Sequence, residues 1–162
     1  ELEPTSFLYN RNLGKTLYYA RRYDEAIEQS LKTLELDPSM PTAYRWLARS
    51  YEQKKLYDKA VEAYLKTMEF GPEVEATFRE AYRTSGWIGF WRKSIDLKKE
   101  RAQTKKIAIS ALAETYVRIG ETDQAIALLE KTKTLLDGDP FWDHLRAEPR
   151  YQHLFRLAPD PE

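Results

Sequence analysis

The sequence predicts an all-α fold built from a repeated pair of helices, and three observations lead to this prediction. Residues 12–38 align with residues 46–72 without a gap, at an offset of 34 residues. Glycine and proline stay out of the interiors of the helical patterns, apart from Gly14, and a proline closes each of these two units. With 42% hydrophobic and 32% charged residues, the composition indicates a globular chain rather than a disordered one.

The first two units cover residues 7–40 and 41–74, and matching residues recur between them. The pairs are Leu13 with Leu47, Tyr23 with Tyr57, Ala26 with Ala60, Leu31 with Leu65, and Pro38 with Pro72. Small residues such as Ala26 and Ala60 allow the two helices of a unit to approach closely, while each unit buries its remaining apolar face against the next. We therefore expect stability to be distributed along an array rather than concentrated in one central core.

The third unit, residues 75–105, is degenerate and contains the aromatic segment SGWIGFWRKS. Continuing the offset places Trp91 at the position of Tyr23 and Tyr57. It places Ser94 at the small position of Ala26 and Ala60. Both residues are predicted to pack in the interior.

The two helices of this third unit are expected at residues 74–86 and 89–105. Gly86 and Gly89 lie at the turn between them and make it easy to bend. Trp87 is the aromatic residue of this segment that we expect to be exposed.

The fourth unit, residues 106–138, is a better match and is followed by a tail at residues 139–162. In the tail, Asp139-Pro140 and Glu148-Pro149 are typical of helix starts. The tail is expected to cover the exposed end of the last unit, because terminal repeats need such a cap for solubility. The apolar residues predicted to form this cap are Phe141, Trp142, Leu145, Tyr151, Leu154 and Phe155.

These units resemble the tetratricopeptide repeat, a 34-residue helix-turn-helix motif. The second unit matches with Tyr44, Leu47, Tyr51, Ala60, Tyr64 and Pro72, and the fourth with Leu112, Ala113, Tyr116, Gly120 and Ala125. The resemblance implies a right-handed α-α superhelix of four helix pairs with a C-terminal capping segment, forming a single domain over residues 1–162. It also implies a non-catalytic module for protein-protein interaction.

A second resemblance concerns the last half of the chain. The tail and the Gly-Trp-x-Gly-Phe-Trp segment look like the C-terminal tetratricopeptide regions of bacterial regulators that carry a winged-helix DNA-binding domain. Because the first residue is Glu1 rather than methionine, we expect the chain to be a piece of such a larger protein. This resemblance implies a scaffold or signal relay in transcription regulation.

Catalytic and metal-binding patterns are missing from the sequence. There is no cysteine, and His144 and His153 lie nine residues apart across a proline, which is not a zinc-binding spacing. No phosphate-binding loop and no nucleophile elbow occur. Asp137-Gly138-Asp139 lacks the downstream ligands of a calcium loop and is interpreted as a turn. We expect no enzyme activity, no metal and no cofactor.

Charge and hydropathy restrict the partners. Twenty-six basic and twenty-six acidic residues cancel, so neither nucleic acid nor a membrane is an expected partner. A local excess of cations lies between Arg79 and Lys106, with nine basic and three acidic residues, and leaves contact with a phosphate backbone as an alternative. No apolar run reaches the roughly 18 residues of a membrane helix. Together with the absence of cysteine, this favours a cytoplasmic location.

The resemblance places ligand-contacting positions on the first helix of each unit. The fifth position holds Arg11, Arg45 and Arg79, and the ninth holds Lys15, Arg49 and Arg83. Each pair is four residues apart, about one helical turn, so both side chains share a helix face. Aromatic residues at the twelfth and thirteenth positions, Tyr18, Tyr19 and Trp87, add candidate contacts. In the fourth unit the pattern ends at Ser110 and Glu114.

We therefore expect a concave groove that binds an acidic peptide through charge-assisted hydrogen bonds. The family's clamp for a terminal carboxylate is not expected, because Trp46 stands where an asparagine is needed. The alternative interpretation is a solvated helix face whose cations are partly neutralised by Glu52, Glu80 and Glu114. Another alternative is a homodimer formed through the aromatic tail or the third unit.

Overall fold

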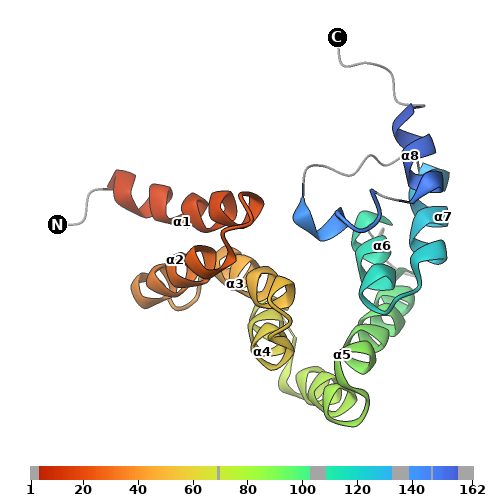
Figure 1. The fold of residues 1–162 in the computed structure, drawn as a ribbon. Helices are drawn as coiled ribbons and strands as arrows, with labels where there is room; N and C mark the ends of the chain where they lie inside the picture. Colours follow the sequence, from red (N-terminus) through yellow and green to blue (C-terminus); the bar gives the residue numbers. More distant parts are fainter. Residues whose placement is uncertain (1–3, 69, 103–108, 133–138, 147, 157–162) are drawn as a thin grey trace. The chain divides into compact units, whose positions relative to one another are not determined.

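The computed structural model describes residues 4–68, 70–102, 109–132, 139–146 and 148–156, and within these ranges it confirms the all-α class (Figure 1). The chain divides into two compact units, Glu1–Gly71 and Pro72–Glu162. Among the described helices, none is both long and apolar enough to cross a membrane.

The first compact unit contains two helix pairs at the predicted positions. α1 (Pro4–Tyr19) pairs with α2 (Tyr23–Leu36), and α3 (Pro41–Gln53) pairs with α4 (Tyr57–Thr67). α3 also packs against both α1 and α2. Sequential packing of this kind is the arrangement of a helical repeat array.

Small residues lie where the helices of a pair come closest. Ala26 and Ala60 are fully buried, as predicted. A Cβ atom added to Gly14 would lie 3.1 Å from Ser30 Oγ of α2, which is tighter than an ordinary contact. The glycine inside α1 is therefore explained by the close approach of α2.

The turns between paired helices share one hydrogen-bonding pattern. The residues with positive φ are Arg21 (59°), Lys55 (58°) and Gly120 (80°). After each of them the next backbone N–H reaches back over five residues, as from Leu56 N to Tyr51 O at 2.9 Å. This pattern satisfies the last carbonyl groups of a helix, and glycine suits its positive φ better than any other residue.

Replacing Lys55 with glycine is expected to stabilise the protein. A residue with a Cβ atom is strained in the left-handed region by about 1 kcal/mol, and glycine removes that strain. Urea unfolding should show a free energy of unfolding raised by about 0.5–1 kcal/mol. As a control, Lys59→Gly inside α4 should lower it by about 1 kcal/mol. A loss of stability in Lys55→Gly would contradict the assigned turn geometry.

The third helix pair differs from its predicted form. The two expected helices are present as the two arms of α5 (Pro72–Ala102), but they meet directly at Gly86, which has non-helical torsions at φ 59° and ψ −151°. The bend brings Phe78 and Phe90 together, with ring centroids 5.2 Å apart. Gly86 alone acts as the turn because these torsions are essentially restricted to glycine.

The aromatic segment after this bend is mainly core. Trp91 and Ser94 are buried, as predicted. Trp87, which was expected to be exposed, is half-buried, and its ring centroid lies 5.5 Å from that of Trp91. Gly89 has ordinary helical torsions, but a Cβ atom there would lie 2.4 Å from the backbone oxygen of Ala81. Gly89 is therefore required for close packing, not for bending.

The second compact unit continues with the fourth helix pair and the tail. α6 (Ile109–Arg118) pairs with α7 (Thr122–Thr132), and the tail contains the 3-10 helix η1 (Pro140–Trp142) and α8 (Pro149–Arg156). Both tail helices begin at the predicted prolines. Asp139 accepts a hydrogen bond from the backbone N–H of residue 141 at 2.9 Å and so caps η1.

The tail covers the fourth pair, as predicted. Its buried residues Phe141, Trp142, Leu145 and Tyr151 form one cluster with Ala113, Ala125, Ile126 and Leu129 of α6 and α7. Arg150 of α8 contacts two carboxylates of α7, Asp123 at 3.3 Å and Glu130 at 2.8 Å. The side chains of Leu154 and Phe155, also predicted to form the cap, lie outside the described residues.

Candidate functional site

Cations and aromatic rings alternate on neighbouring faces of α1 and α3. Lys15 Nζ lies 5.6 Å from the ring centroid of Tyr19, and the Tyr19 ring lies 5.9 Å from that of Trp46. Lys15 and Arg45 are exposed, while Tyr19 and Trp46 are half-buried. We call Lys15, Tyr19, Arg45 and Trp46 the α1–α3 face. A surface of this kind binds anions through its cations and apolar groups through its rings.

Two predicted contact residues lie beneath this face rather than on it. Tyr18 is 0% exposed and its ring centroid lies 5.5 Å from that of Trp46. Arg49 is only 9% exposed, and its guanidinium carbon lies 6.0 Å from the ring centroids of both Tyr18 and Trp46. Both expectations are corrected: Tyr18 is a core residue, and Arg49 supports the Trp46 ring. The packing of α3 on α1 covers them.

The first compact unit contains two of the predicted fifth-position arginines, one on α1 and one on α3. Arg11 lies on α1, and its side chain is outside the described part of the structure. Arg45 is exposed, and neither it nor Lys15 forms an ion pair with any residue in the described part of the chain. The positive charge of these two side chains is therefore available to a ligand.

The remaining predicted cations lie in the second compact unit, on α5, and each is engaged with an acid of the same helix. Arg79 bonds Glu75 at 2.7 Å, and Arg83 bonds both carboxylate oxygens of Glu80 at 2.7 and 2.8 Å. The hydrogen bond from Arg83 lowers the pKa of the Glu80 carboxyl. The expected partial neutralisation by Glu80 is thus present for Arg83. Trp87, on the same helix, stacks on Phe90.

Sequence reasoning missed Arg118, an enclosed cation of the second compact unit. The Arg118 guanidinium carbon lies 4.3 Å from the ring centroid of Trp91 and 4.4 Å from that of Phe141. One of its nitrogens bonds Glu114 Oε2 at 3.2 Å, and its side chain is 3% exposed. Arg118 therefore joins α5, α6 and η1. Its i+4 spacing from Glu114 was visible in the sequence, but the two rings come from distant segments.

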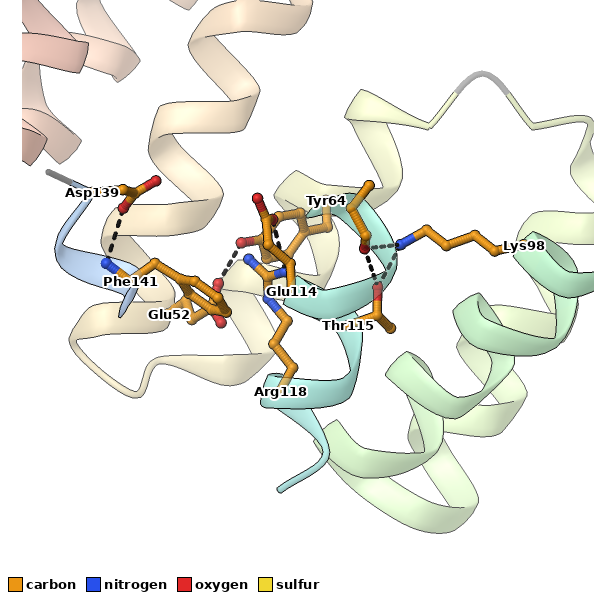
Figure 2. Close-up of polar contacts among 9 residues, drawn as sticks. Glu52, Tyr64, Lys98, Glu114, Thr115, Arg118, Asp139 and Phe141 are labelled. Atoms are coloured by element: carbon orange, nitrogen blue, oxygen red, sulfur yellow. Dashed lines mark hydrogen bonds and ion pairs between the residues drawn. The ribbon is translucent and has the colours of Figure 1, made fainter. Parts of the chain in front are cut away.

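Lys98 is a second missed residue, and Figure 2 shows its amine directed at α6. It donates hydrogen bonds to the Ala111 carbonyl oxygen at 3.0 Å and to the Thr115 hydroxyl. Burial, followed by the nearby charge of Arg118, lowers the pKa of the Lys98 amine to about 8. Lys98 thus connects α5 to α6. In the sequence it was only one of several cations in the basic stretch between Arg79 and Lys106.

The described residues contain no cluster of three or more histidine, cysteine or acidic side chains that could hold a metal ion. His144 is exposed next to the Phe141 ring, and the side chain of His153 lies outside the described residues.

The comparisons with known proteins agree with the helix pairs. Models of the tetratricopeptide repeat match residues 11–73 and residues 108–141, which together make up more than half of the chain. The chain belongs to the tetratricopeptide repeat family, whose members are typically non-catalytic modules for protein-protein interaction. No curated protein matches the chain at a significant level. The two matches give no support to the expected resemblance to bacterial regulators.

Proposed function

We propose that this chain is a non-catalytic protein-interaction module and that the α1–α3 face binds an acidic peptide segment. The observation that carries the proposal is the exposure of Lys15 and Arg45 beside the half-buried rings of Tyr19 and Trp46. Arginine donates two parallel hydrogen bonds to one carboxylate, whereas lysine acts as a point charge. A peptide with alternating acidic and bulky apolar residues fits this combination.

The α5 cations have a smaller part in this proposal. For Arg79 or Arg83 to bind a ligand, the ion pair with Glu75 or Glu80 must first exchange, so the net gain in free energy is reduced. Neither Lys15 nor Arg45 has such a competing acid among the described residues. The proposal therefore assigns most of the electrostatic binding energy to the first compact unit.

Replacing Arg45 with glutamine is expected to weaken binding of an acidic peptide about tenfold, because a hydrogen bond to a charged group contributes about 1.5–3 kcal/mol. The probe is a fluorescein-labelled peptide with four glutamates alternating with four leucines, and the measurement is fluorescence anisotropy. Raising the salt concentration from about 20 to 200 mM should also weaken the binding of the unmodified protein.

Arg83→Gln is the matched control, because it removes the same charge at an exposed position that is already paired with Glu80. Its affinity should stay within about twofold of that of the unmodified protein. The proposal fails if the peptide does not bind, or if Arg45→Gln and Arg83→Gln change the affinity equally.

The proposal also includes a regulatory role for the module within a larger protein. A module that captures an acidic segment suits a larger bacterial protein in which binding is relayed to a DNA-binding domain. The self-association alternative through the tail is disfavoured, since Phe141, Trp142, Leu145 and Tyr151 are buried within their own unit. The sequence preceding residue 1 tests the regulatory context, because it must then encode a winged-helix domain.

A further inference from the structure

The outer face of α2 has an apolar stripe that its own compact unit covers only in part. Ile27, Leu31 and Leu34 are spaced four and three residues apart, so they lie along one side of the helix. Leu31 is 42% exposed, and the other two are half-buried. At the repeat positions of α4 that match Ile27 and Leu31, Val61 and Leu65 are only 2% and 3% exposed. The α2 stripe therefore leaves apolar area in water where α4 does not.

The same face of α2 is acidic. The helix contains four acidic residues and one basic residue, namely Asp24, Glu25, Glu28, Glu35 and Lys32. Since successive helical residues are about 100° apart, Asp24, Glu28 and Glu35 lie beside Leu31 along one edge of the stripe. The matching helix α4 contains two acidic and two basic residues. An acidic edge beside an exposed leucine thus distinguishes the first repeat from the second.

The charges of the inner helices are the opposite. By sequence, α1 contains two basic residues and no acidic one, and α3 contains two basic residues and one acidic residue. The exposed members are Lys15 and Arg45, beside the rings of Tyr19 and Trp46. The chain therefore carries two complementary surfaces, one acidic and aliphatic, the other basic and aromatic.

We propose that the outer face of α2 in one copy of the chain docks on the α1–α3 face of a second copy. This rests on the proposed function, because α2 of the second copy then supplies the acidic segment. Three carboxylates of α2 are already in ion pairs, Asp24 with Lys54, Glu25 with Arg22 and Glu28 with Lys32, but the Glu28 pair is on the surface and contributes little. Glu35 forms no ion pair among the described residues, so its carboxylate is the one most readily bound by the cations of the second copy.

Head-to-tail contact has a distinct consequence for assembly. Because two different surfaces meet, every added copy leaves one surface of each kind open, and growth continues beyond the dimer unless a ring closes. Sedimentation velocity of the full chain at about 20 mM salt should show a mass that rises with concentration above the 19.1 kDa of one copy. At about 300 mM salt the mass should return to that of the monomer.

Two variants separate the surfaces. Leu31→Gln with Glu35→Gln disables the acidic surface, and Lys15→Gln with Arg45→Gln disables the basic one. Each double variant alone should lose association at least about tenfold, whereas their equimolar mixture should form dimers and nothing larger. The control is Leu56→Gln, which changes another exposed leucine outside α2 and should assemble like the unmodified chain.

The outcomes distinguish this inference from the proposed function. If the unmodified chain binds the glutamate-leucine peptide but stays monomeric at low salt, the inference is overturned and the proposed function stands. Assembly that persists in either double variant, or a mixture that grows past the dimer, also overturns it. Release of monomers on adding the peptide, together with retained peptide binding by the Leu31→Gln, Glu35→Gln variant, supports it.

Discussion

Replacing Gly89 with alanine is expected to destabilise the second compact unit by at least about 2 kcal/mol. The added methyl group would lie 2.4 Å from the backbone oxygen of Ala81 and 2.5 Å from Ser85 Cβ. A backbone oxygen cannot rotate away as a flexible side chain can, so the two arms of α5 must separate. Alanine gains about 1 kcal/mol over glycine in helix propensity, and this gain offsets only part of the loss.

The measurement is urea unfolding followed by tryptophan fluorescence, since Trp87 and Trp91 lie on α5 next to this contact. Gly71→Ala is the matched control, because a Cβ atom there meets nothing within 4 Å and the residue has no positive φ. Its stability should change by less than about 0.5 kcal/mol. Equal stability of Gly89→Ala and Gly71→Ala would show that the arms of α5 do not cross at Gly89.

The second large effect is expected for Arg118→Met, which should lower the free energy of unfolding by about 2–4 kcal/mol. Methionine keeps apolar contact with the rings of Trp91 and Phe141 but removes the cation that bonds Glu114. The carboxylate of Glu114 is three-quarters buried and loses this charge partner. A partly buried charge without its partner is the main cost.

Limited proteolysis and urea unfolding test this prediction together. Because Arg118 contacts Phe141 of the tail, cleavage near residues 139–146 should become faster in Arg118→Met. Adding Glu114→Gln should recover part of the stability, since it removes the buried charge. Arg83→Met, which breaks an exposed pair on α5, is the control and should cost less than about 0.5 kcal/mol. Wild-type stability in Arg118→Met would rule out the enclosed position.

Much of the fold could be predicted from the sequence because the pattern of one helix pair recurs in residues 12–38 and 46–72. The offset of 34 aligned Ala26 with Ala60, and both are fully buried where paired helices approach. Prolines 140 and 149 marked the starts of the tail helices correctly. These features depend on local preferences and on spacing along one helix, which a sequence records directly.

The third unit was less predictable. Its residues Trp91 and Ser94 were assigned correctly to the interior, but the two helices meet directly at Gly86 instead of being joined by a separate turn. Alignment treated the two glycines alike, but Gly86 is needed for its torsions and Gly89 for the space beside Ala81. Distinguishing these roles requires knowing what lies across from each residue.

The candidate site, like the fold, could be predicted only in part from the sequence. By itself, the sequence determined that cations recur at the fifth and ninth positions of the first three units and share a helix face. Only the tertiary structure decided which of them are accessible. Arg49 is buried against Tyr18 and Trp46, and Arg83 is paired with Glu80, while Lys15 and Arg45 remain exposed. The physical reason is that helical periodicity gives the direction of a side chain, whereas its burial and charge partners depend on the neighbouring helix.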